Sequence, residues 1–429
     1  MQRRDLLRHA AVLGAVSWGR VGTSAWAAST SQASANGAPP RLIVVFLRGA
    51  VDGLSVVVPH ADADYYRLRS TIALPRPGQT GGALDLDGHF GLHPALQALW
   101  PLWQDGRLAF VHASGSPDPT RSHFDAQDYM ESGTPGRKST PDGWMNRALG
   151  ILPAWAGAPA GLTGAPARAV CLGPTPPRIY AGPNPVAYLP QGPHADRPTL
   201  MDRPRIAQAF SGLYAGNDKM GQAFREGQAA HEEVRDAMSM SPADLQAEMT
   251  RANNGAPLPA GFAQDATRLG TLMRKDARVQ LAFAALGGWD THANQGAAQG
   301  QLANHLSALG EGLAALARGL GPVFEHTVIV TLSEFGRTAA QNGNGGTDHG
   351  HGNVMWLAGG PVRGGRVHGR WPGLDAAGLH EGRDLAVTTD FRWVLAQVLA
   401  RHLRVRDTAL ETVFPQMPGP DAGLDVIRG

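Results

Sequence analysis

The chain has 429 residues, and its 38 basic and 36 acidic side chains leave a formal net charge of +2. This near balance argues against a nucleic acid or an anionic membrane surface as the main partner. Cys171 is the one cysteine, which excludes an internal disulfide and a CxxC metal or redox motif, and we expect a buried thiol there.

The N-terminus has the composition of an export signal. A basic segment with Arg3 and Arg4 precedes a weakly apolar run over 11–18 and a small-residue site, Ala25-Trp26-Ala27. That order is typical of a secretory signal, and the paired arginines indicate the twin-arginine (Tat) route, although an amphipathic first helix is an alternative. The apolar run is too short to cross a membrane.

We therefore predict a signal peptide over 1–27 and a linker over 28–40. The Tat translocase would be the partner during export. The cleaved protein would be periplasmic or secreted, with no stable membrane anchor.

The rest of the chain alternates apolar runs with helical patterns. RLIVVFL at 41–47 is apolar and β-branched throughout, as in a strand buried on both faces. Leucines between 302 and 320 recur at spacings of three and four, which predicts one apolar helix face. The pattern predicts strands over 41–47, 107–113, 169–172, 279–286, 326–332 and 354–358, and helices over 94–104, 199–251, 261–275, 302–320 and 389–402.

This alternation predicts an α/β fold with a mostly parallel central sheet flanked by helices. We expect a single domain over 41–429, with an insert at about 135–275 that is rich in Pro and Gly and then helical.

Carboxylates and imidazoles follow several of the predicted strands. In an open parallel sheet, ligands bind at the carboxyl ends of the strands. Asp and His two residues apart suit a divalent metal, with zinc, manganese or iron favoured over calcium. The residues in these turns include Asp52, Ser122, Asp290, His292, Glu334, Asp348, His349 and His351.

Two of these turns also have a plainer interpretation. Asp290 beside His292 fits a capping aspartate next to a surface histidine. The Gly-rich loop that holds His349 fits a solvated segment. Motifs of competing enzyme classes are missing, since the chain has no GxSxG elbow, Walker A loop, HExxH helix or GxGxxG turn after the first strand.

Taken together, the motifs resemble one known family. The runs FLRGAVDGL, TRSHFDAQDYME, GGWDTHANQ, SEFGRT and TDHGHGNVMWLAGGPVRGG are similar to the exported bacterial family called domain of unknown function 1501, over essentially all of 41–400. The resemblance implies the alkaline phosphatase/sulfatase superfamily. Members of that superfamily hold one or two metals at the strand ends and use a Ser, Thr or modified Cys to attack a phosphate or sulfate ester.

The resemblance also implies roles for individual residues. The metal ligands would be Asp52, Asp290, His292, Glu334, Asp348 and His349 or His351. Glu334-Phe335 stands where the superfamily has Asp-His, so one imidazole is absent there, and either the next loop supplies it or one metal is missing.

The nucleophile is open between Ser122 and Thr120. Arg121 would hold the oxyanion, and Arg337 either clamps ester oxygens or pairs with a carboxylate. Ser122 also fits a helix N-cap, and both roles are compatible because a helix N-terminus favours an anion.

The leading hypothesis is a periplasmic metal-dependent hydrolase of phosphate or sulfate esters, acting on a small-molecule or glycan ester. The rival is a non-catalytic binding or assembly protein on a degenerate hydrolase scaffold. A third possibility is direct attack by water without a covalent intermediate.

Overall fold

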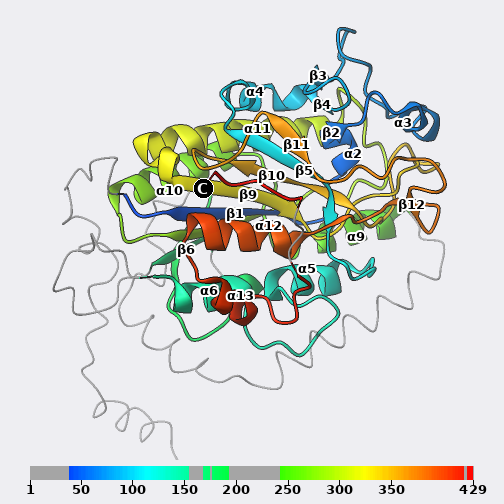
Figure 1. Ribbon diagram of the computed structural model, residues 1–429. Coiled ribbons are helices and arrows are strands. Elements are labelled where there is room, and N and C mark those ends of the chain that lie inside the picture. Colours follow the sequence, from blue (N-terminus) through cyan, green and yellow to red (C-terminus); the bar gives the residue numbers. More distant parts are fainter. Residues whose placement is uncertain (1–37, 154–167, 174–175, 193–241, 420–422, 429) are drawn as a thin grey trace, which may run out of the picture.

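The computed structural model describes residues 38–153, 168–173, 176–192, 242–419 and 423–428 (Figure 1). The predicted signal peptide, most of the predicted linker and residues 199–241 of the helical stretch predicted over 199–251 lie outside these residues. Among the residues described, no helix has both the length and the apolar character needed to cross a bilayer.

A nine-stranded sheet forms the centre of the fold. Its order is β11-β5-β10-β9-β1-β8-β6-β7, with β14 beside β5. The strands are β1 (Arg41–Leu47), β5 (Leu108–Gly115), β6 (Ala169–Leu172), β7 (Ala187–Leu189), β8 (Leu281–Leu286), β9 (Thr327–Ser333), β10 (Asn353–Ala358), β11 (Arg366–His368) and β14 (Thr389–Asp390).

Most neighbouring strands run parallel, but β10 is antiparallel to both β5 and β9. The predicted α/β fold with a mostly parallel sheet is therefore confirmed. Parts of the predicted insert belong to this sheet, since β6 pairs with β8.

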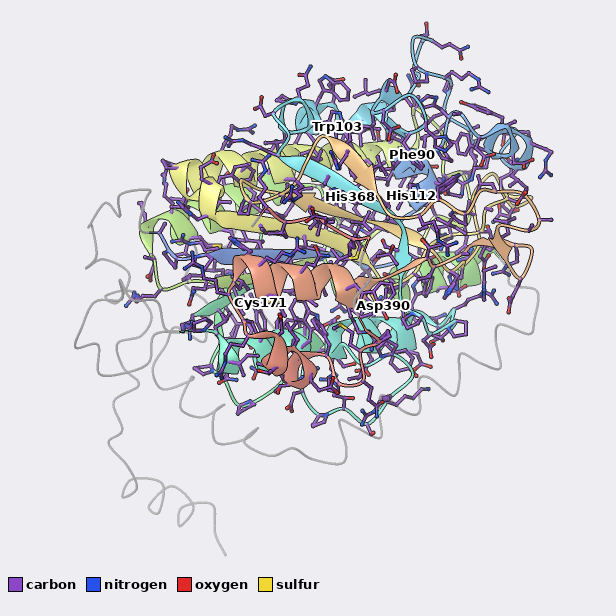
Figure 2. The ribbon with its side chains drawn as sticks, in the orientation of Figure 1. Phe90, Trp103, His112, Cys171, His368 and Asp390 are labelled. Carbon is purple, nitrogen blue, oxygen red and sulfur yellow. The ribbon has the colours of Figure 1, made fainter. Side chains whose placement is uncertain are left out.

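Helices cover both faces of the sheet (Figure 1). One layer contains η2 (Pro94–Leu99), α4 (Trp100–Gln104), α10 (Phe262–Lys275) and α11 (Gln301–Leu320), and the other contains α5 (His123–Ser132), α6 (Trp144–Ile151), α12 (Phe391–Gln397) and α13 (Asp407–Val413). Cys171 in β6 is a buried free thiol, as predicted (Figure 2).

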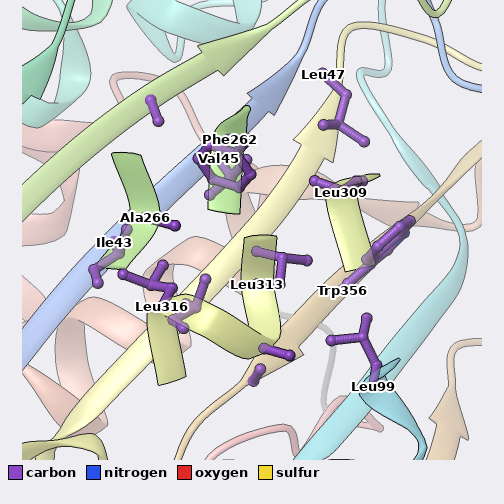
Figure 3. Packing of buried hydrophobic residues seen from close by; sticks show 14 of the residues in the cluster. Ile43, Val45, Leu47, Leu99, Phe262, Ala266, Leu309, Leu313, Leu316 and Trp356 are labelled. Atoms are coloured by element: carbon purple, nitrogen blue, oxygen red, sulfur yellow. The ribbon is translucent and has the colours of Figure 1, made fainter. Parts of the chain in front are cut away.

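The alternation of β1 explains why two helical layers form. Ile43, Val45 and Leu47 pack in the core under α10 and α11, as Figure 3 shows. The residues between them face the opposite layer. Side chains point to alternate faces of a strand, so an unbroken apolar run needs cover on both sides.

The remaining elements are short or connect the larger ones. They are α2 (Gly53–Val56), β2 (Val57–Val58), α3 (Ala63–Leu68), β3 (Leu84–Asp85), β4 (Gly91–Leu92), η3 (Arg178–Tyr180), α9 (Pro242–Ala252), η5 (Gly321–His326), β12 (Leu379–His380), β13 (Asp384–Leu385) and η6 (Val398–His402).

Strand register brings distant parts of the chain to one edge. Leu47 at the end of β1 pairs with Leu286 and with Ser333, the last residues of β8 and β9. Because β10 runs the other way, its first residue, Asn353, lies opposite Ser114 near the end of β5. The segments after β1, β5, β8 and β9 therefore meet the loop before β10.

Candidate metal centre

Three histidine rings and one carboxylate converge at this edge. His123 is the first residue of α5, Asp290 and His292 follow β8, and His349 precedes β10. Nε2 of His349 lies 2.9 Å from Nε2 of His123 and 3.0 Å from Nε2 of His292. Oδ1 of Asp290 lies 2.9 Å from Nε2 of His292 and 3.4 Å from Nε2 of His349. We call these four residues the histidine cluster.

Two further carboxylates hold the outer nitrogens of the rings. Nδ1 of His123 lies 2.8 Å from Oε1 of Glu334, and Nδ1 of His292 lies 3.1 Å from Oδ1 of Asp348. A carboxylate can only accept, so each Nδ1 carries a proton. In the neutral ring, Nε2 then presents its lone pair to the centre of the cluster. Metal-ligating histidines are oriented by outer carboxylates in the same way.

A buried arginine fixes the carboxylate of Asp290. Nη1 of Arg337 donates to Oδ1 of Asp290 at 2.5 Å, and both side chains are fully buried. Burial opposes the charge of Asp290, but Arg337 and then His123 hold its pKa well below the usual range. Oδ2 of Asp290 is buried and accepts no hydrogen bond from the residues described. Asp290 is therefore an anion with one oxygen left over.

The rings differ in their affinity for a proton. Burial disfavours a charged His123, yet Asp290 and Glu334 raise its pKa to about 9. Burial, and then the positive charge of His123, lower the pKa of His349 to about 3. A proton on His123 would therefore compete with a metal cation for the cluster.

The residues fit a divalent metal. Three imidazole nitrogens and a carboxylate oxygen form a donor set typical of zinc, and manganese or iron accept the same donors. Metal bonds of ~2.0–2.1 Å in tetrahedral geometry separate the donors by about 3.3 Å. The separations of His349 from His123 and His292, and of the Asp290 oxygens from the three rings, run from 2.9 Å to 3.5 Å. Oδ2 of Asp290, which accepts no hydrogen bond from the described part of the chain, would be free to bind the metal.

Glu334 supports the cluster from behind. Besides His123, its Oε1 accepts from the backbone N–H of Gly49 at 2.7 Å and from Nε2 of Gln127 at 3.0 Å. The neighbouring ring of Phe335 lies 4.9 Å from the ring of His123 and 5.3 Å from that of His349. The Glu-Phe pair therefore packs around two histidines, and His349 supplies an imidazole from the following loop.

Asp52 lies in a second buried centre. Its two oxygens accept from Nη1 of Arg69 at 2.6 Å and from Nη2 at 2.9 Å. Ser55 and Gln295 also donate to Oδ2, both at 2.7 Å. The structure thus engages the whole carboxylate of Asp52 without the histidine cluster.

The two predicted catalytic residues before α5, Ser122 and Arg121, have different surroundings. Ser122 is at the N-cap position of α5, one of the two roles that its sequence position allowed, but its hydroxyl makes no capping hydrogen bond. Arg121 donates to Asp384 at 2.8 Å and to Glu381 at 2.6 Å.

Of the two candidate histidines in the loop before β10, only His349 joins the cluster. The ring of His351 instead packs on that of His380, with centroids 4.5 Å apart. Arg337 was open between an ester clamp and a carboxylate partner, and here it pairs with Asp290.

Sequence reasoning did not select His123, Gln127 or Glu248. His123 stands in the run TRSHFD, next to the candidate hydroxyl nucleophiles Thr120 and Ser122. Its position just after a long loop at a strand end was the available signal. Glu248 lies in α9, within reach of His292 and His349. No motif marks it.

The protein is thus an α/β protein with a candidate metal centre, formed by histidines and a carboxylate, at the carboxyl ends of its parallel strands. The chain belongs to the DUF1501 family: the family model "Protein of unknown function (DUF1501)" matches residues 39–414. The family predicted from the motifs is thus confirmed. No curated protein sequence matches the chain.

Two solved structures show distant likeness. The lipoteichoic acid synthase LtaP from Listeria monocytogenes has 9% identity and a TM-score of 0.30, over 75% of this chain and 66% of that one. The C-terminal periplasmic domain of EptC from Escherichia coli, in complex with Zn, has 10% identity and a TM-score of 0.34, over 76% and 74%. At these values the likeness adds nothing to the assignment of site residues.

Proposed function

We propose that the chain is an exported, metal-dependent hydrolase of phosphate or sulfate esters. The observation that carries the proposal is the convergence of three imidazole Nε2 atoms on Asp290, each within 3.5 Å of one of its oxygens. His123, His292, His349 and Asp290 would hold one divalent cation. When bound, the cation would act as a Lewis acid on an ester oxygen and lower the pKa of a nearby hydroxyl.

The protein's own groups would keep this centre ready. Glu334 and Asp348 hold the Nδ1 protons of His123 and His292, so both Nε2 atoms face inward and would present lone pairs to a bound cation. Arg337 keeps Asp290 ionised and fixed.

Ser122 is our candidate nucleophile. It immediately precedes a ring of the cluster, and the first turn of α5 does not use its hydroxyl. The helix N-terminus beside it favours a developing negative charge.

The metal centre is tested by a pair of loop variants two residues apart. Protein purified without chelators should carry near-stoichiometric zinc, manganese or iron by elemental analysis. His349→Gln should lose the metal, whereas His351→Gln, which changes a ring packed on His380, should keep it. A metal-free, folded native protein would contradict the proposal and favour the binding or assembly protein.

The chemistry is tested on phosphate and sulfate monoesters with the loaded protein. Ser122→Ala should abolish turnover without loss of metal. Full turnover in Ser122→Ala would support direct attack by water instead. If Ser122→Ala and His349→Gln both keep full activity, metal-dependent hydrolysis at this site is contradicted.

Export to the periplasm is part of the same proposal and rests on the N-terminal sequence. Replacing Arg3 and Arg4 by lysines should leave uncleaved precursor in the cytoplasm. Normal periplasmic delivery of that variant would contradict the twin-arginine route.

A further inference from the structure

The helix α9 reaches the histidine cluster from outside the sheet. Its last residue, Ala252, accepts a hydrogen bond from Nε2 of Gln127 at 2.8 Å, and the same nitrogen donates to Glu334. The side chain of Asn254 returns a bond to Oε1 of Gln127 at 3.2 Å. One amide therefore joins the end of α9 to the residue that supports His123.

The end of α9 also packs on the loop that carries Asp290. Oδ1 of Asn253 accepts from the backbone N–H of Gly288 at 2.6 Å. A Cβ added at Gly287 would lie 2.5 Å from Cγ of Asn253, so only glycine allows this approach. The α9 end is thus in direct contact with two of the segments that form the cluster.

Glu248 lies one helical turn before this contact. Residues four apart share a helix face, so Glu248 lies on the side of Ala252, which is 2% exposed. A carboxylate oxygen of Glu248 and a ring nitrogen from each of His292 and His349 all lie within 4.8 Å of one another. Glu248 therefore stands beside two rings of the cluster, on a helix held in place at its end.

Charge favours a carboxylate at this position. Arg337 already offsets the charge of Asp290 within the cluster. The three imidazoles are neutral when they bind a cation, and Glu334 and Asp348 contact their outer nitrogens, so a further anion beside the rings would lower the free energy of a divalent ion there. Glutamate is a hard oxygen donor that zinc, manganese and iron all accept.

We propose that Glu248, held by α9 beside His292 and His349, is a further protein donor to the cation of the histidine cluster. The inference rests on the proposed metal centre. It adds a ligand from a segment that carries none of the sequence motifs.

The test compares Glu248→Gln with Glu311→Gln. Glu311 is an exposed residue of α11, so the second variant removes the same charge outside the site. The zinc affinity of each full-length protein is measured by competition with a chromophoric chelator. Glu248→Gln should bind zinc at least about tenfold more weakly than the native protein, and Glu311→Gln should bind it equally well.

Cobalt(II) then separates a donor from a residue that acts through the histidines. The visible absorption of bound cobalt depends on its ligands, so Glu248→Gln should change the spectrum and Glu311→Gln should not. Unchanged zinc affinity, or a cobalt spectrum that superimposes on that of the native protein, would overturn the proposal. Circular dichroism of the metal-free variants confirms that both are folded.

The two proposals fail in different ways. If the native protein binds no metal, the metal centre itself is wrong. If the native protein binds zinc, His349→Gln loses it and Glu248→Gln does not weaken it, then only the role of Glu248 is wrong.

Discussion

Two buried carboxylates follow neighbouring parallel strands, and each meets a buried arginine. Asp52 follows β1 and gives both of its oxygens to Arg69. Asp290 follows β8 and gives only Oδ1 to Arg337, so Oδ2 is left without a hydrogen bond among the residues described. In the proposed metal centre, the arginine partner of each aspartate, more than its position at a strand end, would therefore decide which carboxylate has an oxygen free for a cation.

The largest expected effect separates the two aspartates by metal affinity. Asp290→Asn should weaken zinc binding by more than about 100-fold, because it removes an anionic donor from the cluster. Asp52→Asn should leave the affinity of the folded protein nearly unchanged, because Arg69 and not the cluster uses that carboxylate. Chelator competition measures both. Equal losses of zinc affinity in the two variants would show that Asp52 and Asp290 belong to one metal site.

The second effect is on stability at Asp52. Asp52→Asn should lower the free energy of unfolding by about 3–5 kcal/mol, because Arg69 would remain charged and fully buried without its partner. Urea unfolding of the metal-free protein measures it. The double variant Asp52→Leu/Arg69→Met should be less destabilised than Asp52→Asn, and a larger loss in the double variant would contradict a buried ion pair.

A third prediction concerns two buried histidines that contrast with His123. In His112, Nε2 donates to the carbonyl of Val57 and Nδ1 accepts from the N–H of Ala113, so the ring must stay neutral. His93 is used in the same way, between Ala297 and Ala95. Burial lowers the pKa of each to about 4 from 6.5.

Acid should therefore destabilise the fold. Between pH 6.5 and about 4 these two histidines are protonated in the unfolded chain but stay neutral in the folded protein. The free energy of unfolding therefore falls as pH falls, by up to ~1.4 kcal/mol per pH unit for each ring. His123, whose pKa is raised, has the opposite effect, and only above this window. His93→Asn keeps a capping acceptor for Ala95 and should reduce the slope. Thermal unfolding from pH 4 to 7 measures it, and an unchanged slope would contradict the neutral ring.

The smallest expected effect on the free energy of unfolding is at Ser122. Its hydroxyl makes no capping bond, so Ser122→Ala should change the free energy of unfolding by less than about 0.5 kcal/mol. Asp390→Ala is the comparison, and it should cost more than about 1 kcal/mol, because Asp390 caps α12 through the N–H of Arg392 and its carboxylate also pairs with the buried guanidinium of Arg392 at 2.6 Å. Equal losses in urea unfolding would mean that Ser122 is a structural cap.

The sequence predicts the sheet and its edge well, because both follow from local pattern. The apolar run 41–47 is β1 as predicted, and the leucine spacing predicts α11 almost to the residue. The antiparallel direction of β10 is not visible in its residues, because direction depends on how a loop returns to the sheet.

The site was predicted in part for a similar reason. Asp290, His292 and His349 were expected near one another, and the structure brings them together. Arg69, which takes Asp52, is 17 residues away in sequence, and His123 is 226 residues from His349. Tertiary packing determines which of these residues come into contact, and the local pattern of a single sequence does not show such contacts.

The separation of His123 from His349 also has a consequence for folding. The donors of the cluster come from α5, from the segment after β8 and from the loop before β10, so no short stretch of chain can assemble it. Long-range contacts form late because loop closure must come first. A bound cation would then slow unfolding much more than it would speed folding, because its site is complete only late in folding.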